Sequence, residues 1–283
     1  MVIYLKKNLQ YIEKAKKEKY AIPQFNINNL EWAKYILEVC QEEKSPVFLG
    51  VSTGAAKYMG GYNTVVGMVK GLIKDLEITI PVIIHLDHSP SYEECKKAFE
   101  AGFDSLMIDA STESIEDNIN ETNKVSALGD VLVEAELGRI GGVEDDITNK
   151  ERYTTKEEAE YFCSKTNVDM LAPSLGSVHG VYKSEPNINF ELIKEISTST
   201  GVGLVLHGGS GLSKEILQKA ISLGVIKINI NTELQVAWNN SVREFIASDE
   251  LVYDPRKIIS SGSVAIKDAI KEAIKILGCK NKG

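Results

Sequence analysis

The sequence lacks any long hydrophobic run, and its first ten residues, MVIYLKKNLQ, hold no apolar signal core. A membrane-spanning helix needs about 20 predominantly apolar residues. A secretory signal needs an apolar segment after its basic start. We therefore expect a soluble, cytoplasmic protein without a membrane partner.

Positive charge is also scarce relative to negative charge. The chain has 32 Lys and Arg against 40 Asp and Glu, which gives a net charge of −8 and a pI near 5.2. Surfaces that bind nucleic acid are usually basic, so we expect no nucleic-acid partner. A local site for a small anion stays open, because backbone amides at a helix N-terminus bind phosphate without net positive charge.

Cysteines are few and widely spaced. The four are Cys40, Cys95, Cys163 and Cys279, and no two form a CxxC pair. This spacing favours reduced thiols in a cytosolic protein over a disulfide framework.

What the sequence does contain is a regular alternation of short apolar runs and longer amphipathic stretches. Strands buried on both faces of a parallel sheet read as such apolar runs. The predicted strands are Ala21–Phe25, Val47–Val51, Val82–Leu86, Ser105–Ile108, Val131–Glu136, Met170–Ala172, Val202–Leu206 and Ile226–Ile230. The helical patterns lie near 30–43, 60–75, 91–101, 115–128, 154–166, 189–199, 213–222, 233–247 and 262–277.

Eight alternating units in 283 residues predict an α/β fold, a (β/α)8 TIM barrel with extra helices at its C-terminal end. The alternative is a doubly wound open sheet, but no GxGxxG follows the first strand. No composition shift marks a linker, so we expect one domain over residues 1–283. The long polar connection from Gly138 to Thr154 suggests a mobile loop.

All four histidines of the chain fall at predicted strand ends. His85 and His88 end the third strand in VIIHLDHSP, His179 follows the sixth strand, and His207 ends the seventh. The carboxyl ends of barrel strands are where such folds place their chemistry. Three neutral imidazoles with an open position suit a catalytic zinc ion. His88, His179 and His207 are the predicted ligands, and His85 is expected to be packed or orienting.

Three carboxylates accompany these histidines. Asp87 lies beside His88, where it is expected to act as acid or base on a substrate hydroxyl. The alternative for Asp87 is to orient a ligand histidine. Asp109 and Glu136 end the fourth and fifth strands, and they form either a second metal position or a salt bridge in the barrel mouth.

The last two predicted strands carry a glycine-rich anion signal. HGGSG at 207–211 and NINTE at 229–233 stand where TIM barrels bind phosphate, after strands seven and eight. Gly180 and Lys183, which follow His179, are expected to extend this site.

Taken together, these motifs closely resemble the class II, metal-dependent ketose-bisphosphate aldolases, above all the fructose-1,6-bisphosphate aldolases of the shorter bacterial and protist type. The resemblance covers almost the whole chain. It rests on YAIPQFNINNLE, GVSTGAAKYMGG, HLDHSPSYEEC, MIDAS, VEAELGRIGGVEDD, APSLGSVHGVYKSEPN, LHGGSG, KININTE and YDPRK.

The resemblance implies reversible aldol cleavage of fructose 1,6-bisphosphate to dihydroxyacetone phosphate and glyceraldehyde 3-phosphate, in glycolysis and gluconeogenesis, through a zinc-stabilised enediolate. It implies that Asp87 acts on the C4 hydroxyl and that Glu144 moves the C3 proton. It makes Asp109 and Glu136 an alternate metal position. The substrate-binding residues that we expect are Asn26, Ser52, Gly180, Lys183, Gly208, Gly209, Ser210, Asn229, Asn231, Thr232 and Arg256.

The resemblance also implies partners and a further ion. A monovalent cation, Na⁺ or K⁺, is expected near the phosphate loop. A homodimer or a dimer-based homo-oligomer is expected, in which Arg256 reaches the second phosphate of the substrate bound to the neighbouring subunit.

Two alternatives concern the reaction. A lysine Schiff base, for which Lys227 is the candidate, also supports aldol cleavage, but the histidine trio favours a metal. Tagatose-1,6-bisphosphate aldolases tend to read HGAS and NVATE where this chain reads HGGS and NINTE, which favours fructose. Where relatives often read ASHHPFEEN, this chain has ASTESIEDN, so it places no histidine in the loop after the fourth strand.

Overall fold

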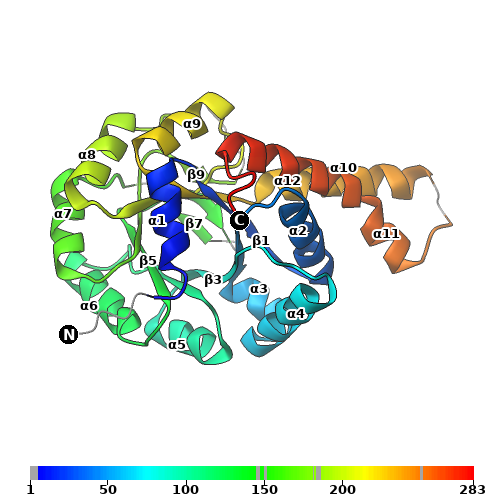
Figure 1. Cartoon of the computed structure of the whole chain (residues 1–283), viewed down its shortest axis with the longest axis horizontal. Helices are drawn as coiled ribbons and strands as arrows, with labels where there is room; N and C mark the ends of the chain where they lie inside the picture. The colour runs from blue at the N-terminus through cyan, green and yellow to red at the C-terminus, as the bar shows by residue number, and fades with distance from the viewer. Residues whose placement is uncertain (1–5, 145–146, 150–151, 181, 183–185, 249–250) are drawn as a thin grey trace.

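Eight parallel strands close into a barrel, as predicted (Figure 1). The computed structural model describes residues 6–144, 147–149, 152–180, 182, 186–248 and 251–283. Around the barrel the strand order is β1-β11-β10-β8-β5-β4-β3-β2. Their bounds are β1 Ile22–Asn26, β2 Val47–Ser52, β3 Val82–Ser89, β4 Ser105–Ile108, β5 Leu132–Leu137, β8 Met170–Pro173, β10 Gly203–Leu206 and β11 Val225–Ile230.

Helices surround the barrel and bury the outer faces of its strands (Figure 1). Several of them begin at a Ser, Thr or Asn whose side chain accepts a backbone N–H of the first turn, as Ser91, Ser114 and Thr155 do. The helices around the barrel are α2 Leu30–Glu42, α3 Thr53–Tyr58, α4 Tyr62–Asp75, α5 Tyr92–Ala101, α6 Ile115–Ser126, α7 Lys156–Lys165, α8 Phe190–Thr200, α9 Lys214–Leu223 and α12 Ser263–Leu277.

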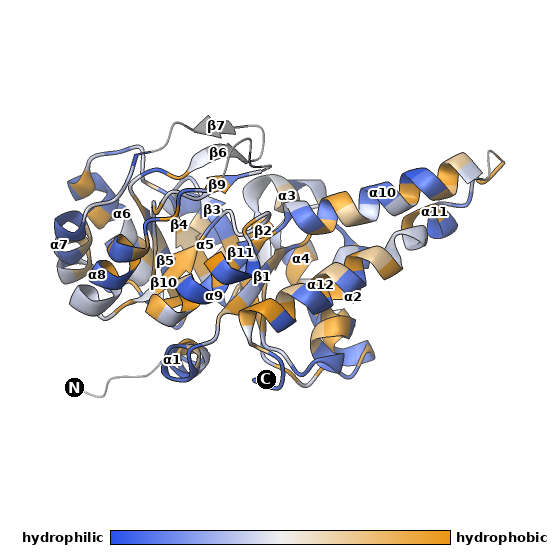
Figure 2. Cartoon of the chain, turned by 90° about the horizontal axis from the view of Figure 1, so that it is seen from above, coloured by the Kyte–Doolittle hydropathy of each residue, from blue (hydrophilic) through white to orange (hydrophobic). Residues whose placement is uncertain are grey.

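The two ends of the barrel are built differently (Figure 2). Helix α1 (Leu9–Glu18) lies at the amino end of the strands, and Glu18 in its last turn pairs with Lys282 near the carboxyl terminus of the chain. At the opposite end, β6 (Gly141–Glu144) pairs with β7 (Ile147–Asn149) and with β9 (Val178–His179) in a small separate sheet. This sheet covers the end where the predicted site lies.

Helices α10 (Thr232–Ser248) and α11 (Pro255–Ser261) extend away from the barrel as an arm (Figures 1 and 2). The side chains of Leu251 and Tyr253, between the two helices, are 86% and 89% exposed.

The inside of the barrel is polar near its carboxyl end. Successive strand residues point to opposite faces, so residues two apart share a face. Gln24 and Asn26, His85 and Asp87, Glu134 and Glu136, and Lys227 and Asn229 are such pairs, and all eight side chains are buried. Gly50 makes room for them, because a Cβ there would lie 2.6 Å from Gln24 Nε2.

The strand predictions hold to within about three residues at each end, whereas several short elements escaped prediction. Helices α1, α3 and α11 were not predicted, nor were β6, β7 and β9. The connection Gly138–Thr154 contains the β6–β7 antiparallel pair in its described part. The helix expected near 213–222 begins at Lys214, because Ser213 caps it.

Two simpler expectations concern thiols and membranes. The four cysteines are free thiols. Among the described helices, none is both long enough and apolar enough to span a bilayer.

Candidate active site

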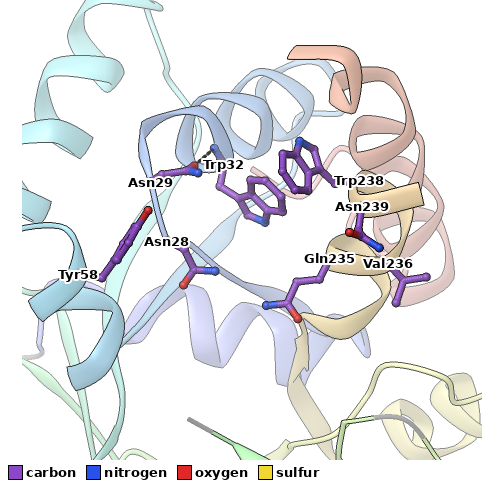
Figure 3. Close-up of a pocket in the computed structure, with 8 residues that line it drawn as sticks. All are labelled: Asn28, Asn29, Trp32, Tyr58, Gln235, Val236, Trp238 and Asn239. Carbon is purple, nitrogen blue, oxygen red and sulfur yellow. Dashed lines mark hydrogen bonds between the residues drawn. The ribbon is translucent and has the colours of Figure 1, made fainter. Parts of the chain in front are cut away.

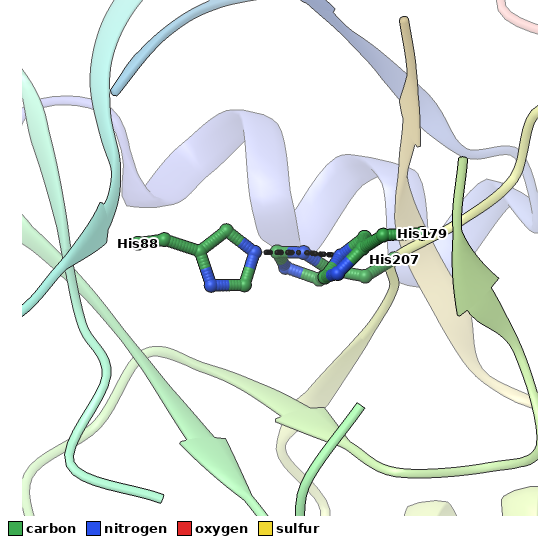
Figure 4. A group of neighbouring side chains, drawn as sticks. All are labelled: His88, His179 and His207. Carbon is green, nitrogen blue, oxygen red and sulfur yellow. Dashed lines mark hydrogen bonds between the residues drawn. The ribbon is translucent and has the colours of Figure 1, made fainter. Parts of the chain in front are cut away.

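Three histidines converge at the carboxyl end of the barrel (Figure 4). His88 Nε2 lies 2.9 Å from His207 Nδ1, and His179 Nε2 lies 3.5 Å from the same atom. His88 is the last residue but one of β3, His179 ends β9, and His207 follows β10. One nitrogen from each ring lies within 4.8 Å of the other two, so the structure brings the predicted trio together.

A backbone irregularity aims His88 at this point. Its φ is +46°, in the left-handed region that only a few per cent of non-glycine residues adopt. The pairing of β3 with β4 shifts register between Leu86 and Ser89. Such a bulge redirects a side chain at a barrel rim, and left-handed backbone of this kind is concentrated at functional sites.

A buried carboxylate fixes the protonation of His207. His207 Nε2 donates to Glu134 Oε1 at 2.9 Å, so Nδ1 is the nitrogen left with a free lone pair toward the other two rings. Burial, followed by the nearby His88 and Lys227, holds the pKa of His207 well below its usual range. A lowered pKa favours the neutral imidazole, which is the form that binds a metal.

The three nitrogens fit a tetrahedral metal ion. Zinc–nitrogen bonds of about 2.0–2.1 Å place neighbouring ligand nitrogens about 3.3 Å apart, and the two separations at His207 Nδ1 bracket that value. Three imidazole nitrogens, with the Glu134 carboxylate behind His207, match the donor set of catalytic zinc sites. These residues therefore suit zinc.

Asp109 and Glu136 approach the other side of the His88 ring. His88 Nδ1 lies 3.1 Å from Asp109 Oδ2 and 3.5 Å from Glu136 Oε2. Burial alone would raise the pKa of Asp109, but His88 and Ser111 outweigh it and hold that pKa at about 2. The two groups of potential ligands thus share His88 through opposite nitrogens, and the carboxylates can either bind a displaced metal or orient His88.

Asp87 is fully buried beside the trio, and both of its oxygens accept hydrogen bonds. Asn26 Nδ2 donates to Oδ2 at 3.1 Å, and Asn229 Nδ2 donates to Oδ1 at 3.4 Å. Asn229 Nδ2 also lies 3.1 Å from His207 Nδ1, so one amide links Asp87 to the histidine trio. A carboxylate in this position can exchange a proton with a substrate bound at the barrel mouth.

His85 lies deeper than the trio, as its predicted supporting role requires. His85 Nδ1 is 2.8 Å from Ser105 Oγ. His85 Nε2 is 3.7 Å from Glu134 Oε2 and 3.9 Å from Asp87 Oδ1, which is too far for hydrogen bonds. Neither of the potential metal-binding groups among the described residues includes it.

The glycine-rich loop after β10 packs against the end of β11. Ser210 Oγ accepts the N–H of Asn231 at 3.1 Å, and Gly209 N–H donates to Asn229 O at 3.0 Å. Gly208 has a φ of +64°, and a Cβ on it would lie 2.2 Å from Val178 O. A glycine is required at 208, because any side chain would push β9 and His179 away.

A cavity of about 430 Å³ opens beside this loop. Tyr182, which was not among the predicted residues, joins its walls: its hydroxyl donates to Gly208 O at 2.9 Å and accepts Val178 N–H at 3.2 Å. The cavity is lined by Gly180, Tyr182, Ser210, Gly211, Thr232, Glu233, Val236 and Ala237. It therefore gathers three of the predicted phosphate-binding residues, Gly180, Ser210 and Thr232.

The remaining predicted residues do not all meet at this point. The Ser52 hydroxyl caps α3 by accepting Ala55 N–H at 3.1 Å. Arg256 lies on the arm, its side chain is 90% exposed, and its guanidinium pairs with Asp254 at 2.9 Å. Glu144 ends β6, but its side chain lies outside the described residues, as does Lys183.

A second cavity, of about 480 Å³, lies between α2, α3 and the start of α10 (Figure 3). Trp32 and Trp238 meet edge to face there, with ring centroids 5.0 Å apart. None of the predicted site residues lines it. The lining residues are Asn28, Asn29, Trp32, Tyr58, Gln235, Val236, Trp238 and Asn239.

The closed barrel and the histidine trio define a metal-dependent barrel enzyme. The family model for class II fructose-bisphosphate aldolase matches residues 6–282. The chain is 52% identical over 278 residues to a fructose-bisphosphate aldolase of Geobacillus stearothermophilus, covering 96% of each protein. It is 51% identical over 272 residues to one of Staphylococcus aureus, covering 95% of each.

Solved structures agree with these matches. The YdjI aldolase from Escherichia coli K12 superposes with a TM-score of 0.84 at 35% identity, over 97% of each chain. A putative fructose-1,6-bisphosphate aldolase from Coccidioides immitis superposes with a TM-score of 0.88 at 29% identity, over 98% of this chain and 99% of that one. The chain belongs to the class II fructose-bisphosphate aldolase family, and is thus a metal-dependent lyase.

Glu134 and Lys227 are parts of the site that the sequence analysis did not assign to it. Glu134 entered the prediction only as part of the strand Val131–Glu136, and Lys227 only as a possible Schiff-base lysine. The sequence pattern could have indicated this pair, because both residues are charged and lie in otherwise apolar predicted strands. A charged residue at such a position needs a buried partner. Their pairing, with Lys227 Nζ 2.9 Å from Glu134 Oε2, also argues against Lys227 as a free amine nucleophile.

Proposed function

We propose that this enzyme cleaves fructose 1,6-bisphosphate to dihydroxyacetone phosphate and glyceraldehyde 3-phosphate, and catalyses the reverse condensation. The observation that carries the proposal is the convergence of His88, His179 and His207 beside the buried carboxylate of Asp87. Zinc held by the three nitrogens would supply a Lewis acid for the substrate ketone.

The protein's own residues have separate tasks in this proposal. Asp87 exchanges the proton of the C4 hydroxyl, held in place by the amides of Asn26 and Asn229. Glu144 moves the C3 proton. Asp109 orients His88 or, with Glu136, holds the metal in a displaced position.

Phosphate binding is assigned to the loops after β9, β10 and β11. Gly180, Ser210 and Thr232 line the cavity beside the trio, where the C1 phosphate would meet backbone and hydroxyl donors. Lys183, Gly208, Gly209, Asn229 and Asn231 complete this set, and a monovalent cation, Na⁺ or K⁺, accompanies the phosphate. Asn26 and Ser52 contact the remaining part of the sugar.

Fructose rather than tagatose is the proposed sugar, because the chain reads HGGS and NINTE and because its relatives at 51–52% identity are named fructose-bisphosphate aldolases. The test compares kcat/KM for fructose 1,6-bisphosphate and tagatose 1,6-bisphosphate, before and after chelation and after restoring Zn²⁺. We expect a preference for fructose, loss of activity on chelation and recovery with Zn²⁺. Full activity after verified metal removal would overturn the metal mechanism, and a tagatose preference would overturn the sugar assignment.

The working unit is proposed to be a homodimer or a dimer-based oligomer in the cytoplasm. The arm exposes Leu251 and Tyr253, and it carries Arg256 with its side chain 90% exposed. In this proposal Arg256 reaches the second phosphate of the substrate in the neighbouring subunit.

A hybrid-dimer experiment tests both the dimer and Arg256. Arg256→Gln is expected to raise KM about tenfold or more, because a charge-assisted contact to phosphate is worth about 1.5–3 kcal/mol. Co-expressing Arg256→Gln with Asp87→Ala would form hybrid dimers in which one site has both wild-type residues. We expect activity well above that of either variant alone. Activity equal to the sum of the separate variants would contradict a contribution from the partner subunit.

A further inference from the structure

Lys227 is a fully buried cation that the proposed chemistry does not use. It lies in the middle of β11 and points into the barrel, below the histidine trio. A buried ammonium is costly unless it is paired and hydrogen-bonded. Lys227 Nζ lies 2.9 Å from Glu134 Oε2 and donates to Asn229 Oδ1 at 3.0 Å, so it has two separate partners.

The first partner leads to the metal-binding histidine. Lys227 holds one oxygen of Glu134, and the other oxygen, Oε1, accepts the Nε2–H of His207 at 2.9 Å. The carboxylate is thus clamped between an ammonium and an imidazole. This clamp keeps the proton of His207 on Nε2 and leaves Nδ1 facing His88 and His179.

The second partner leads to the acid/base residue. A lysine ammonium has only donors, so the atom of Asn229 that faces Lys227 must be the carbonyl oxygen Oδ1. The amide nitrogen Nδ2 is then forced to the opposite side, where it lies 3.4 Å from Asp87 Oδ1 and 3.1 Å from His207 Nδ1. The ammonium thus selects the same orientation of the amide as the Asp87 carboxylate, which can only accept, and it does so through the shorter contact of 3.0 Å.

We infer that Lys227 is a positioning residue that orients a metal-binding histidine through Glu134 and the acid/base carboxylate Asp87 through Asn229. This inference rests on the proposed metal site and the proposed role of Asp87. In this inference the single charge of Lys227 orients both the metal-binding His207 and the acid/base residue Asp87. A purely structural ion pair would stabilise the barrel without affecting either residue.

The test replaces Lys227 by methionine, which has a similar length and no charge. Lys227→Met leaves Glu134 as an uncompensated buried carboxylate that is free to reorient away from His207. We expect the affinity for Zn²⁺ to fall about 10–100-fold, as when other groups behind metal ligands are lost. The measurement is competition for Zn²⁺ against a chromophoric chelator at one fixed pH, without any sugar.

A double variant separates the two links that start at Lys227. These are the Glu134 branch, which leads to His207, and the Asn229 branch, which leads to Asp87. In Lys227→Met combined with Glu134→Gln, the glutamine oxygen can still accept from His207, and no carboxylate is left unpaired. We expect its Zn²⁺ affinity to recover to within about threefold of the wild-type value. The kcat of the zinc-saturated double variant should stay about 10-fold or more below wild type, because Asn229 still lacks its donor.

Lys6→Met is the matched control. Lys6 also pairs with a carboxylate, that of Asp169 at 2.5 Å, but at the amino end of the barrel. Its removal should change neither Zn²⁺ affinity nor kcat. Circular dichroism and thermal melting of each metal-free variant verify folding, and the neutral double variant serves if Lys227→Met does not fold.

Three outcomes would overturn the inference. A folded Lys227→Met protein with Zn²⁺ affinity within twofold of wild type removes the Glu134 branch. A zinc-saturated double variant with wild-type kcat removes the Asn229 branch. A wild-type chain that binds no Zn²⁺ overturns the metal site itself, whereas a chain that binds Zn²⁺ but cleaves no ketose bisphosphate overturns the proposed reaction and leaves the Glu134 branch testable.

Discussion

Replacing His179 by alanine is expected to lower the affinity of the enzyme for Zn²⁺ by more than about 100-fold and to abolish most cleavage activity. Loss of a group behind a metal ligand already costs about 10–100-fold, and His179 supplies one of the three converging nitrogens itself. The measurement is zinc content after dialysis, followed by chelator competition. The protein should remain folded, because His179 lies on a small outer sheet and not in a barrel strand.

The fourth histidine provides the matched control. His85→Asn keeps a polar atom near the position of Nδ1 to pair with Ser105. This variant should bind one zinc per chain, because His85 does not contact the converging nitrogens. Unchanged zinc affinity in His179→Ala, or loss of zinc from His85→Asn alone, would contradict the assignment of the ligands.

Replacing Asp87 by alanine should reduce kcat for cleavage by about 10²–10⁴-fold, the usual contribution of a positioned acid or base. Zinc should stay bound at one ion per chain, because Asp87 contacts Asn26 and Asn229 and is not a ligand. A second readout is sharper. If Asp87 serves only the C4 hydroxyl, the variant should still exchange the C3 proton of dihydroxyacetone phosphate with solvent.

Asp104→Ala controls for the loss of a partly buried carboxylate. Asp104 accepts Ile84 N–H at 3.0 Å near the amino end of β4, away from the trio. It should lower stability without changing kcat. Wild-type turnover in Asp87→Ala, or loss of proton exchange together with cleavage, would show that Asp87 does not have the separate role assigned to it.

The barrel was predictable because its strands are short apolar runs at regular intervals, and β4 was predicted to the residue. Helix α1 escaped because its mean composition is polar, with only Ile12 and Ala15 buried. The sheet formed by β6, β7 and β9 escaped for another reason. Its pairing joins Gly142 to His179, and such contacts between distant segments leave no local periodicity.

The site was predictable as a set of ligand types at strand ends, but its inner support was not. Histidines are rare enough in this chain that their common location was informative. The pairing of Glu134 with Lys227 depends on the order of strands around the closed barrel, because β5 and β11 lie on different sides of it. Spacing along the sequence does not contain that information, which is why Lys227 was considered only as a nucleophile.

The chain has two tryptophans, and they form the single edge-to-face pair of Trp32 and Trp238 between α2 and the base of the arm. Tryptophan fluorescence therefore reports on this one pair, whose ring centroids lie 5.0 Å apart. The indole N–H of Trp238 donates to Ile259 O on α11, so this pair is attached directly to the arm. Tryptophan fluorescence is thus a label-free measure of how the arm packs against α2.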